Sequence, residues 1–175
     1  MHVALVGKAG AGKDTIADYL VQNYGFKKFA FADKIKEIVY DLFPDAGPKP
    51  RKLFQDVGMF FRGIDKDVWV KYLCRKVEKE PGNVVVADVR FKNELEELRK
   101  LGFISVRVEA AEEIRKRRLL ERDGEINKER LNHVSETDLD DVVCDYLIVN
   151  NEKLEQLYSM IKLLIESLRF MALSF

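Results

Sequence analysis

The chain has 175 residues, of which 47% are hydrophobic and 34% are charged, and its 30 Lys and Arg balance its 30 Asp and Glu. This composition is typical of one globular domain and excludes the fibrous, disordered and membrane-spanning classes. The zero net charge argues against nucleic acid or an anionic membrane as a partner, and two cysteines without a pattern predict reduced thiols and a cytoplasmic location.

Apolar stretches alternate with helical patterns along the chain, which predicts an α/β fold with a parallel sheet. The expected strands are 3–6, 26–32, 84–87, 103–108 and 146–149. Between them we expect helices at about 14–24, 35–42, 51–61, 67–80, 91–101 and 112–122. A long last helix has its apolar stripe over Leu154–Leu168, and Asn151 is its expected N-cap.

A phosphate-binding loop is predicted between the first strand and the first helix, where Gly7–Lys13 fits the pattern G-x-x-x-x-G-K. Glycines are needed there because the backbone N–H groups must point inward and approach the phosphates closely. The helix N-terminus adds partial positive charge, and Lys13 supplies a mobile charge for the β- and γ-phosphate oxygens. We therefore expect ATP to be bound by Gly7, Gly10, Ala11, Gly12, Lys13, Asp14 and Thr15.

The loop departs from the usual pattern at Asp14, which stands where a Ser or Thr hydroxyl normally binds Mg²⁺, with Thr15 one residue later. Asp14 could hold the ion directly or through water, since Mg²⁺ accepts carboxylates and keeps waters. It could equally cap the helix and favour its dipole. The sequence leaves both roles open and offers Asp14, Thr15 and Asp88 as candidate magnesium-binding residues.

Asp88 and Arg90 are expected at the carboxyl end of a strand that neighbours the first strand. Ligands of an open parallel sheet bind at this edge. A carboxylate there can orient a Mg²⁺-bound water or an acceptor, and an arginine can clamp a phosphate with two parallel hydrogen bonds. The alternative is a solvated turn, because charged residues often follow strands.

The segment Glu112–Arg122 is predicted to be a strongly charged helix. Arg115, Arg118 and Arg122 are spaced at i, i+3 and i+7, which places them on one face. Such a face beside a polar, glycine-containing segment indicates a lid that closes over the transferring phosphoryl group. The alternative is a solvated helix stabilised by ion pairs along its surface.

Other polar and aromatic residues are interpreted as structural. His133 and Glu136 have no further Cys or His nearby, so they predict no metal site. Ser135 and Asp138 have the spacing of a helix capping box. Aromatic residues of one region are expected in the core rather than in a base-stacking platform, namely Trp69, Phe54, Phe60 and Phe61.

Several short motifs follow one another over nearly the whole chain. They are Gly12-Lys-Asp-Thr15; Phe31-Ala-Asp33 with Lys36; Gln55, Gly58, Arg62, Asp65 and Trp69; Asp88-Val-Arg-Phe-Lys-Asn-Glu94; and His133-Val-Ser-Glu136 before Asp145–Asn150. Together they resemble the deoxynucleoside monophosphate kinase-like group of P-loop kinases. Animal-type phosphomevalonate kinase looks like a more distant relative with the same Gly-Lys-Asp loop, and dephospho-CoA kinase and adenylate kinase share the broader plan.

The resemblance implies a three-layer P-loop NTPase fold with a five-stranded parallel sheet, a helical acceptor-binding insert and a lid. One domain, 1–175, would comprise a core of 1–32, 83–110 and 141–175, an insert of about 33–80 and a lid of about 111–140. The resemblance also implies roles for matched residues: ATP binding by Lys13, Arg115 and Asn150; acceptor binding by Asp33, Lys36, Arg62 and Arg90; and catalysis by Lys13, Asp88, Arg90, Arg118 and Arg122.

The chain is thus predicted to transfer the γ-phosphoryl group of ATP to a nucleoside or deoxynucleoside monophosphate, with Mg²⁺ as cofactor. Alternatives are an acceptor of the dephospho-CoA or phosphomevalonate type, and a non-catalytic nucleotide-binding regulator. A GTP-dependent switch is not indicated, because Asn127-Lys-Glu-Arg130 ends in arginine where the guanine-binding pattern N-K-x-D needs aspartate. A motor or AAA-type ATPase would need a longer chain.

Overall fold

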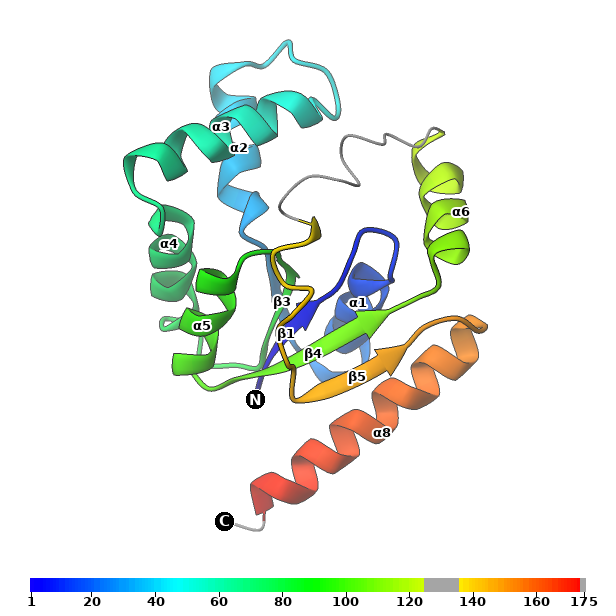
Figure 1. The fold of residues 1–175 in the computed structure, drawn as a ribbon. Coiled ribbons are helices and arrows are strands. Elements are labelled where there is room, and N and C mark those ends of the chain that lie inside the picture. Colours follow the sequence, from blue (N-terminus) through cyan, green and yellow to red (C-terminus); the bar gives the residue numbers. More distant parts are fainter. Residues whose placement is uncertain (125–135, 174–175) are drawn as a thin grey trace.

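The computed structural model describes residues 1–124 and 136–173. Its centre is a five-stranded sheet in the order β2-β3-β1-β4-β5, in which every neighbouring pair is parallel (Figure 1). This confirms the predicted α/β class and places β3 beside β1. The strands are β1 (His2–Val6), β2 (Lys27–Phe29), β3 (Val84–Val89), β4 (Phe103–Glu109) and β5 (Tyr146–Val149).

Helices cover both faces of the sheet and complete three layers. One face carries α1 (Lys13–Tyr24) and α8 (Leu154–Leu173). The other carries α4 (Val68–Val77) and α5 (Lys92–Lys100). Because each face is buried under helices, the inner strands read as continuous apolar runs rather than as alternating patterns.

The middle strand β1 shows how the sequence builds both layers at once. Val3 and Leu5 belong to the apolar cluster shared with α1 and α8, whereas Ala4 and Val6 belong to the cluster shared with α4 and α5. Successive side chains of a strand point to opposite faces, so four apolar residues in a row contribute to both clusters. All four are fully buried.

Three further helices rise beyond the carboxyl ends of the strands, with α2 (Ala32–Leu42) and α3 (Arg51–Ile64) on one side and α6 (Glu112–Asp123) on the other (Figure 1). Helices α3 and α6 are in contact where Arg51 donates to both carboxylate oxygens of Asp123, at 2.9 and 2.5 Å. The space between them therefore lies directly over the edge at which the sequence predicts the site.

The second strand is shorter than predicted, because the chain turns into a helix early. The expected strand 26–32 is observed only as β2 (Lys27–Phe29), and α2 already begins at Ala32. The backbone N–H groups of Phe31 and Ala32 donate to the carboxylate of Asp88 on β3. This cap starts the helix before the strand pattern ends.

Two other boundaries also differ. The third helix runs through Gly63 to Ile64, where the sequence had predicted a break, because one glycine costs a helix only about 1 kcal/mol. Asn151 does not cap the last helix, which begins at Leu154. Its side-chain oxygen instead accepts a hydrogen bond from the backbone N–H of Ala111 at 2.7 Å.

The core assignment of the aromatic residues is right for Trp69 and wrong for Phe60. Trp69 is 3% exposed and donates its ring N–H to the carbonyl of Gly58, whereas Phe60 is 66% exposed. Phe54 and Phe61 are half-buried. The helical period of α3 explains the difference, because it turns Phe60 away from the face that packs on α4.

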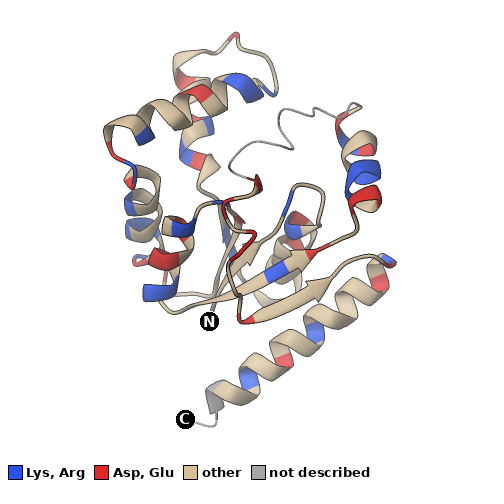
Figure 2. Cartoon of the chain, in the orientation of Figure 1, with Lys and Arg blue, Asp and Glu red and all other residues tan. Residues whose placement is uncertain are grey.

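Charged side chains of both signs are interspersed over the helices, as the balanced composition requires (Figure 2). In the described ranges 1–124 and 136–173, no helix combines the length and the apolar character that crossing a membrane would demand.

Candidate active site

The loop between β1 and α1 has the backbone that the glycine pattern predicts. Gly10 and Gly12 have φ values of 80° and 103°, in the left-handed region that favours glycine. Both are also approached closely: a Cβ atom on Gly10 would lie 2.7 Å from the carbonyl oxygen of Arg115, and one on Gly12 would lie 2.3 Å from the side-chain nitrogen of Asn150. A residue with a Cβ atom fits these positions only by displacing the backbone of α6 at Arg115 or the side chain of Asn150.

Lys13 is the first residue of α1 and folds back over the loop. Its ammonium group donates to the carbonyl oxygens of Gly7 and Lys8, the latter at 3.1 Å. Burial, together with the nearby Arg90, lowers the pKa of Lys13 to about 8, and Glu136 opposes the shift. An anion bound in the loop would restore the charge of this lysine and replace the carbonyl oxygens as its partner.

Asp14 does not cap α1, because the N-cap is Gly12 and no side chain caps this end. The Asp14 carboxylate is 75% exposed and pairs with Lys28 at 2.9 Å. Burial alone would raise its pKa, but this hydrogen bond and the charge of Lys28 lower it overall. Thr15 follows on the same turn and is half-buried. The capping role that the sequence left open is therefore wrong.

Asp88 and Arg90 do not form a solvated turn. The Asp88 carboxylate accepts the N–H groups of Phe31 at 2.8 Å and Ala32 at 3.0 Å, so it fixes the start of α2. Burial raises the pKa of Asp88, and these two N–H donors oppose the shift. Arg90 donates to a carboxylate oxygen of Glu136 at 2.5 Å.

Glu136 joins the two parts of the site and was not among the residues predicted to act there. One of its oxygens accepts the N–H of Ala9 in the phosphate loop at 2.7 Å, and the other accepts Arg90. Its side chain is 3% exposed. The only sequence signal was the motif ending at this residue. His133 and Ser135 of that motif lie outside the described residues, and Asp138, expected in a capping box with Ser135, accepts the N–H of Lys92 at the start of α5.

Of the three arginines that their spacing places on one face of α6, Arg115 and Arg118 face the phosphate loop. Arg115 lies 3.3 Å from the carbonyl oxygen of Ala9, and Arg118 lies 3.5 Å from that of Gly10. Arg122 instead pairs with Asp123 at 2.8 Å, the carboxylate that also binds Arg51 of α3. The purely solvated helix is thus wrong for the face that carries Arg115 and Arg118.

Asn150, directly after β5, holds the loop from the other side. Its side-chain nitrogen donates to the carbonyl of Ala11 at 2.8 Å, and its oxygen lies 3.4 Å from Arg118. The residue is 4% exposed. Beside this contact, an open groove of about 360 Å³ is lined by residues that include Gly7, Lys8, Ala111, Arg115 and Asn151.

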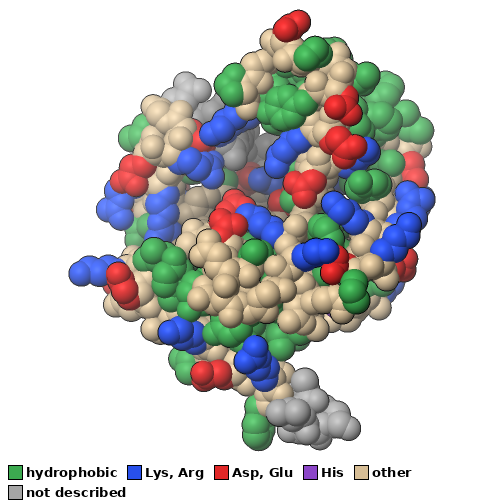
Figure 3. Space-filling model, turned by 180° about the vertical axis from the view of Figure 1, so that it is seen from behind, with side chains coloured by type: hydrophobic (Ala, Val, Ile, Leu, Met, Phe, Trp, Pro, Cys, Tyr) green, Lys and Arg blue, Asp and Glu red, His purple; other side chains and the backbone are tan. Residues whose placement is uncertain are grey.

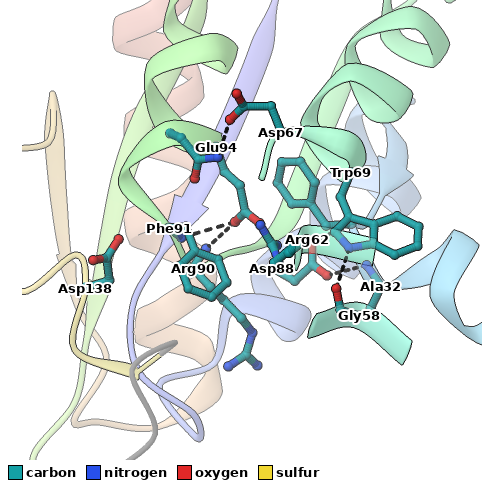
Figure 4. A network of polar contacts seen from close by, with 12 residues as sticks. Ala32, Gly58, Arg62, Asp67, Trp69, Asp88, Arg90, Phe91, Glu94 and Asp138 are labelled. Carbon is teal, nitrogen blue, oxygen red and sulfur yellow. Dashed lines mark hydrogen bonds and ion pairs between the residues drawn. The ribbon is translucent and has the colours of Figure 1, made fainter. Parts of the chain in front are cut away.

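The predicted acceptor residues fall into two groups. Asp33 and Lys36 lie on α2, 3.7 Å apart. Arg62 of α3 and Arg90 both contact Glu94, which accepts the Arg62 guanidinium at 2.5 Å and the backbone N–H of Arg90 at 2.8 Å (Figure 4). Seen from behind, the surface is hollowed between the helices that rise beyond the strand ends, and Lys and Arg side chains border the hollow (Figure 3).

Glu94 is the second buried carboxylate that the sequence analysis did not single out as functional. It is 1% exposed, and burial raises its pKa to about 7 while Arg62 opposes the shift. The one signal in the sequence was its spacing, because a glutamate three residues after Phe91 and four before Leu98 lies on the apolar face of the helix. Its partners come from distant parts of the chain, which spacing does not reveal.

Comparison with known proteins identifies the kind of domain. A family model described as an AAA domain matches residues 3–157. A curated protein of Acanthamoeba polyphaga mimivirus, named "Putative deoxynucleotide monophosphate kinase", is 28% identical over 195 aligned positions, which cover 91% of this chain and 93% of that protein. The expectation that an AAA-type protein needs a longer chain is wrong for this family, because its model matches within these 175 residues.

Solved structures show the same fold. A shikimate kinase from Acinetobacter baumannii superimposes with a TM-score of 0.59 and 17% identity, over 95% of this chain and 93% of that one. A gluconokinase from Sinorhizobium meliloti gives a TM-score of 0.60 and 14% identity, over 97% and 96% of the two chains. The architecture is therefore that of a P-loop kinase.

Proposed function

Since the chain belongs to the AAA domain family and has the fold of a P-loop kinase, we propose that it transfers the γ-phosphoryl group of ATP to a nucleoside or deoxynucleoside monophosphate. One observation carries the proposal: Glu136 links the phosphate loop directly to Arg90, so a donor-binding loop and a phosphate-binding arginine meet at one edge of the sheet. The choice of acceptor is supported by the mimivirus relative named as a putative deoxynucleotide monophosphate kinase, whose similarity covers nearly the full length of both chains.

The donor half would be formed by the loop and the lid helix. The backbone N–H groups of the loop, with Lys13, would hold the β- and γ-phosphates. Arg115 and Arg118 are within 3.5 Å of loop carbonyls and would turn from them to the phosphoryl oxygens. The groove of about 360 Å³ between the lid helix and Asn151 would receive the ribose and base. We propose the segment of about 111–140 as the lid, part of which lies outside the described residues.

The acceptor half would lie under the helical insert of about 33–80. Arg62 and Arg90, both charged side chains held by buried carboxylates, would bind the acceptor's phosphate, and Asp33 and Lys36 of α2 would contact the rest of it. An arginine can match two phosphate oxygens at once, which fixes the acceptor's orientation as well as its charge.

In the proposed reaction, an oxygen of the acceptor's phosphate forms a bond to the γ-phosphorus. The bond from that phosphorus to the oxygen bridging to the β-phosphate breaks, and ADP leaves. The attacking oxygen is already anionic, so no strong general base is required. The contacts of Asp88 agree with a reaction that needs no general base, because both of its oxygens accept backbone N–H groups and so hold the start of α2. Lys13, Arg118 and Arg122 would neutralise the charge that develops on the transferring group.

Mg²⁺ would supply charge neutralisation between the β- and γ-phosphates. The residues that would hold this ion offer hard oxygen atoms: Asp14 and Thr15 on the first turn of α1, and Asp88 near the end of β3. Asp14 already binds a cation, the ammonium group of Lys28, at 2.9 Å. A reaction that consumes ATP and nucleotides fits a cytoplasmic location.

The test is ADP release with Mg·ATP and a panel of acceptors, namely all common ribo- and deoxynucleoside monophosphates, phosphomevalonate and dephospho-CoA. We expect rapid turnover of one or a few nucleotides, and none in the Lys13→Ala variant. Turnover of only phosphomevalonate or dephospho-CoA would overturn the choice of acceptor. Silence across the panel, with ATP still raising the melting temperature, would point to a nucleotide-binding regulator.

A further inference from the structure

A single buried carboxylate connects the insert to the edge of the central strands. Glu94 lies on the first turn of α5 and is 1% exposed. One of its oxygens accepts the N–H groups of Arg90 at 2.8 Å and Phe91 at 3.1 Å. The other accepts the guanidinium of Arg62 at 2.5 Å (Figure 4). Three donors from two parts of the chain thus converge on one side chain.

Glu94 cannot itself touch a substrate, because both of its oxygens are occupied and its surface is covered. Burying an ionised carboxylate is costly unless it is paired and hydrogen-bonded. Capping α5 would require only the bond to Phe91, the residue that precedes the helix. The contacts to Arg62 and to the backbone of Arg90 are therefore additional, and both lead to residues of the acceptor half.

The two arginines are held in different ways. Arg62 is fixed at its charged end, by Glu94 on one side and by the ring of Phe91, 4.3 Å from the guanidinium carbon, on the other. Arg90 is fixed at its backbone, from which its side chain leads away from Glu94 (Figure 4). The guanidinium group of Arg90 donates to Glu136. Glu94 therefore fixes the guanidinium group of Arg62 on the insert and the backbone from which the Arg90 side chain leaves the end of β3.

We propose that Glu94 is a positioning residue for the acceptor's phosphate: by holding Arg62 and the backbone of Arg90 together, it sets the spacing at which the two guanidinium groups receive that phosphate. The inference rests on the proposed function and deepens it. Within the insert, α3 is in turn anchored on α4, where Trp69 donates to the carbonyl of Gly58 at 3.0 Å. The arginine of the insert is thus tied both to its own helices and to the strand edge.

A substitution can separate positioning from capping. Glutamine serves in a capping box as well as glutamate does, so Glu94→Gln keeps the bond to Phe91. It removes the negative charge that holds Arg62. Glu97→Gln is the matched control, because Glu97 lies on the same helix and pairs on the surface with Lys100. A merely structural Glu94 would tolerate the change as the control does.

The experiment compares both variants with the wild-type protein on the nucleoside monophosphate panel. For Glu94→Gln we expect the KM of the acceptor to rise about tenfold or more, while the KM of ATP changes less than about twofold. Equal changes in both KM values, or none, would overturn the proposal. If Glu94→Gln does not fold, Glu94→Asp keeps the charge but withdraws it by one methylene, and the same split is expected.

A second experiment measures by calorimetry the binding of AMP, GMP, CMP, UMP and dTMP in the absence of ATP. It tests the role of Glu94 independently of whether the protein is a kinase. Turnover tests the function, whereas weaker binding of a monophosphate to Glu94→Gln than to wild type tests the role of Glu94. Binding that is lost in the variant supports the proposal even if no turnover is seen. Binding that is equal in both proteins, or absent in the wild type, overturns it.

Discussion

The two halves of the site are built by different means. The proposed donor half centres on one stretch of seven residues, Gly7–Lys13, whose backbone conformation is dictated by glycines between a strand and a helix. The proposed acceptor half has no such stretch: Arg62 comes from α3 and Arg90 follows the end of β3. Both arginines depend on buried carboxylates, Glu94 and Glu136, to hold them in place.

This difference predicts which part of the site should tolerate substitutions. A loop that binds phosphate with backbone N–H groups fails when its backbone is altered, because no side chain can take over. A site made of several arginines loses affinity gradually, because each guanidinium group and each supporting carboxylate contributes separately to binding. Changes in the donor half should therefore abolish activity, and changes in the acceptor half should mainly alter affinity.

The largest expected effect is that of Lys13→Ala. Removing the ammonium group that folds back over the loop should lower kcat by about 10²–10³-fold or more, as loss of a positioned transition-state donor does. The fold should survive, because the lysine is held only by two loop carbonyls and its pKa is lowered by burial to about 8. Steady-state kinetics and a thermal melt measure the two quantities.

Lys116→Ala provides the control for this variant, since Lys116 pairs with Glu112 on the outside of the lid helix. Its kinetics should match those of the wild type. Near-normal turnover by Lys13→Ala would contradict the assignment of the loop as the donor site.

Gly12→Ala should disable the donor half through the backbone. The residue has φ 103°, and the new methyl group would lie 2.3 Å from the side-chain nitrogen of Asn150. We expect a loss of about 1–3 kcal/mol in the free energy of unfolding and loss of measurable ATP binding. Gly63→Ala, in the interior of α3 with open space around it, should instead stabilise the protein by about 0.5–1 kcal/mol. Urea denaturation and calorimetry distinguish the two, and equal effects would refute the backbone argument.

The contrast between the halves also explains what the sequence could reveal. Three features follow from local patterns. Glycine spacing predicts the phosphate loop, apolar runs predict the sheet, and the helical period predicts that Arg115 and Arg118 share the face that meets the loop. Glu94 and Glu136 could not be found this way, because their function depends on partners 32 and 127 residues away. A glutamate is ordinarily a solvated residue, and packing shows that these two are buried.

The early start of α2 illustrates the same limit. The apolar run after Phe26 favoured a strand up to Ala32, and the local pattern contains nothing against it. The deciding interaction is the Asp88 carboxylate, 56 residues further along the chain, which accepts the N–H of Ala32. Tertiary contacts therefore override local preference at the place where the acceptor half is assembled.

Asn150→Ala should weaken the donor half less than a change within the loop. It would leave the buried carbonyl of Ala11 without its side-chain donor, which costs about 1–3 kcal/mol of stability. The affinity for ATP should fall with it, because the loop loses its support from the segment after β5. Asn23→Ala, whose side chain bonds to its own helix on the surface, should change neither quantity. An unchanged ATP affinity in Asn150→Ala would show that the loop holds its shape without this contact.

Stability should depend on pH through Glu94, in the acceptor half. Burial raises its pKa from 4.5 to about 7, so the native state binds more protons than the unfolded state between these values. The contribution of Glu94 to the free energy of unfolding is therefore fully present below pH 4.5 and is lost as the pH rises through 7. Arg62 and Asp88 face the same carboxylate and oppose each other's effect on it. Subtracting the urea-unfolding free energies of Glu94→Gln from those of the wild type, from pH 5 to 8, isolates this slope, and a flat difference would contradict it.

The smallest expected effect concerns the contact between the two halves. Arg51 of the insert binds Asp123 at the end of the lid helix through two hydrogen bonds, but Arg51 is 44% exposed. Arg51→Ala should therefore cost only about 1 kcal/mol, and less at high salt, because water and ions screen an exposed pair. Lys52→Ala, which removes a surface pair within α3, should cost less still. If the contact holds insert and lid together, Arg51→Ala should also raise both KM values in parallel, unlike Glu94→Gln, which should raise that of the acceptor alone.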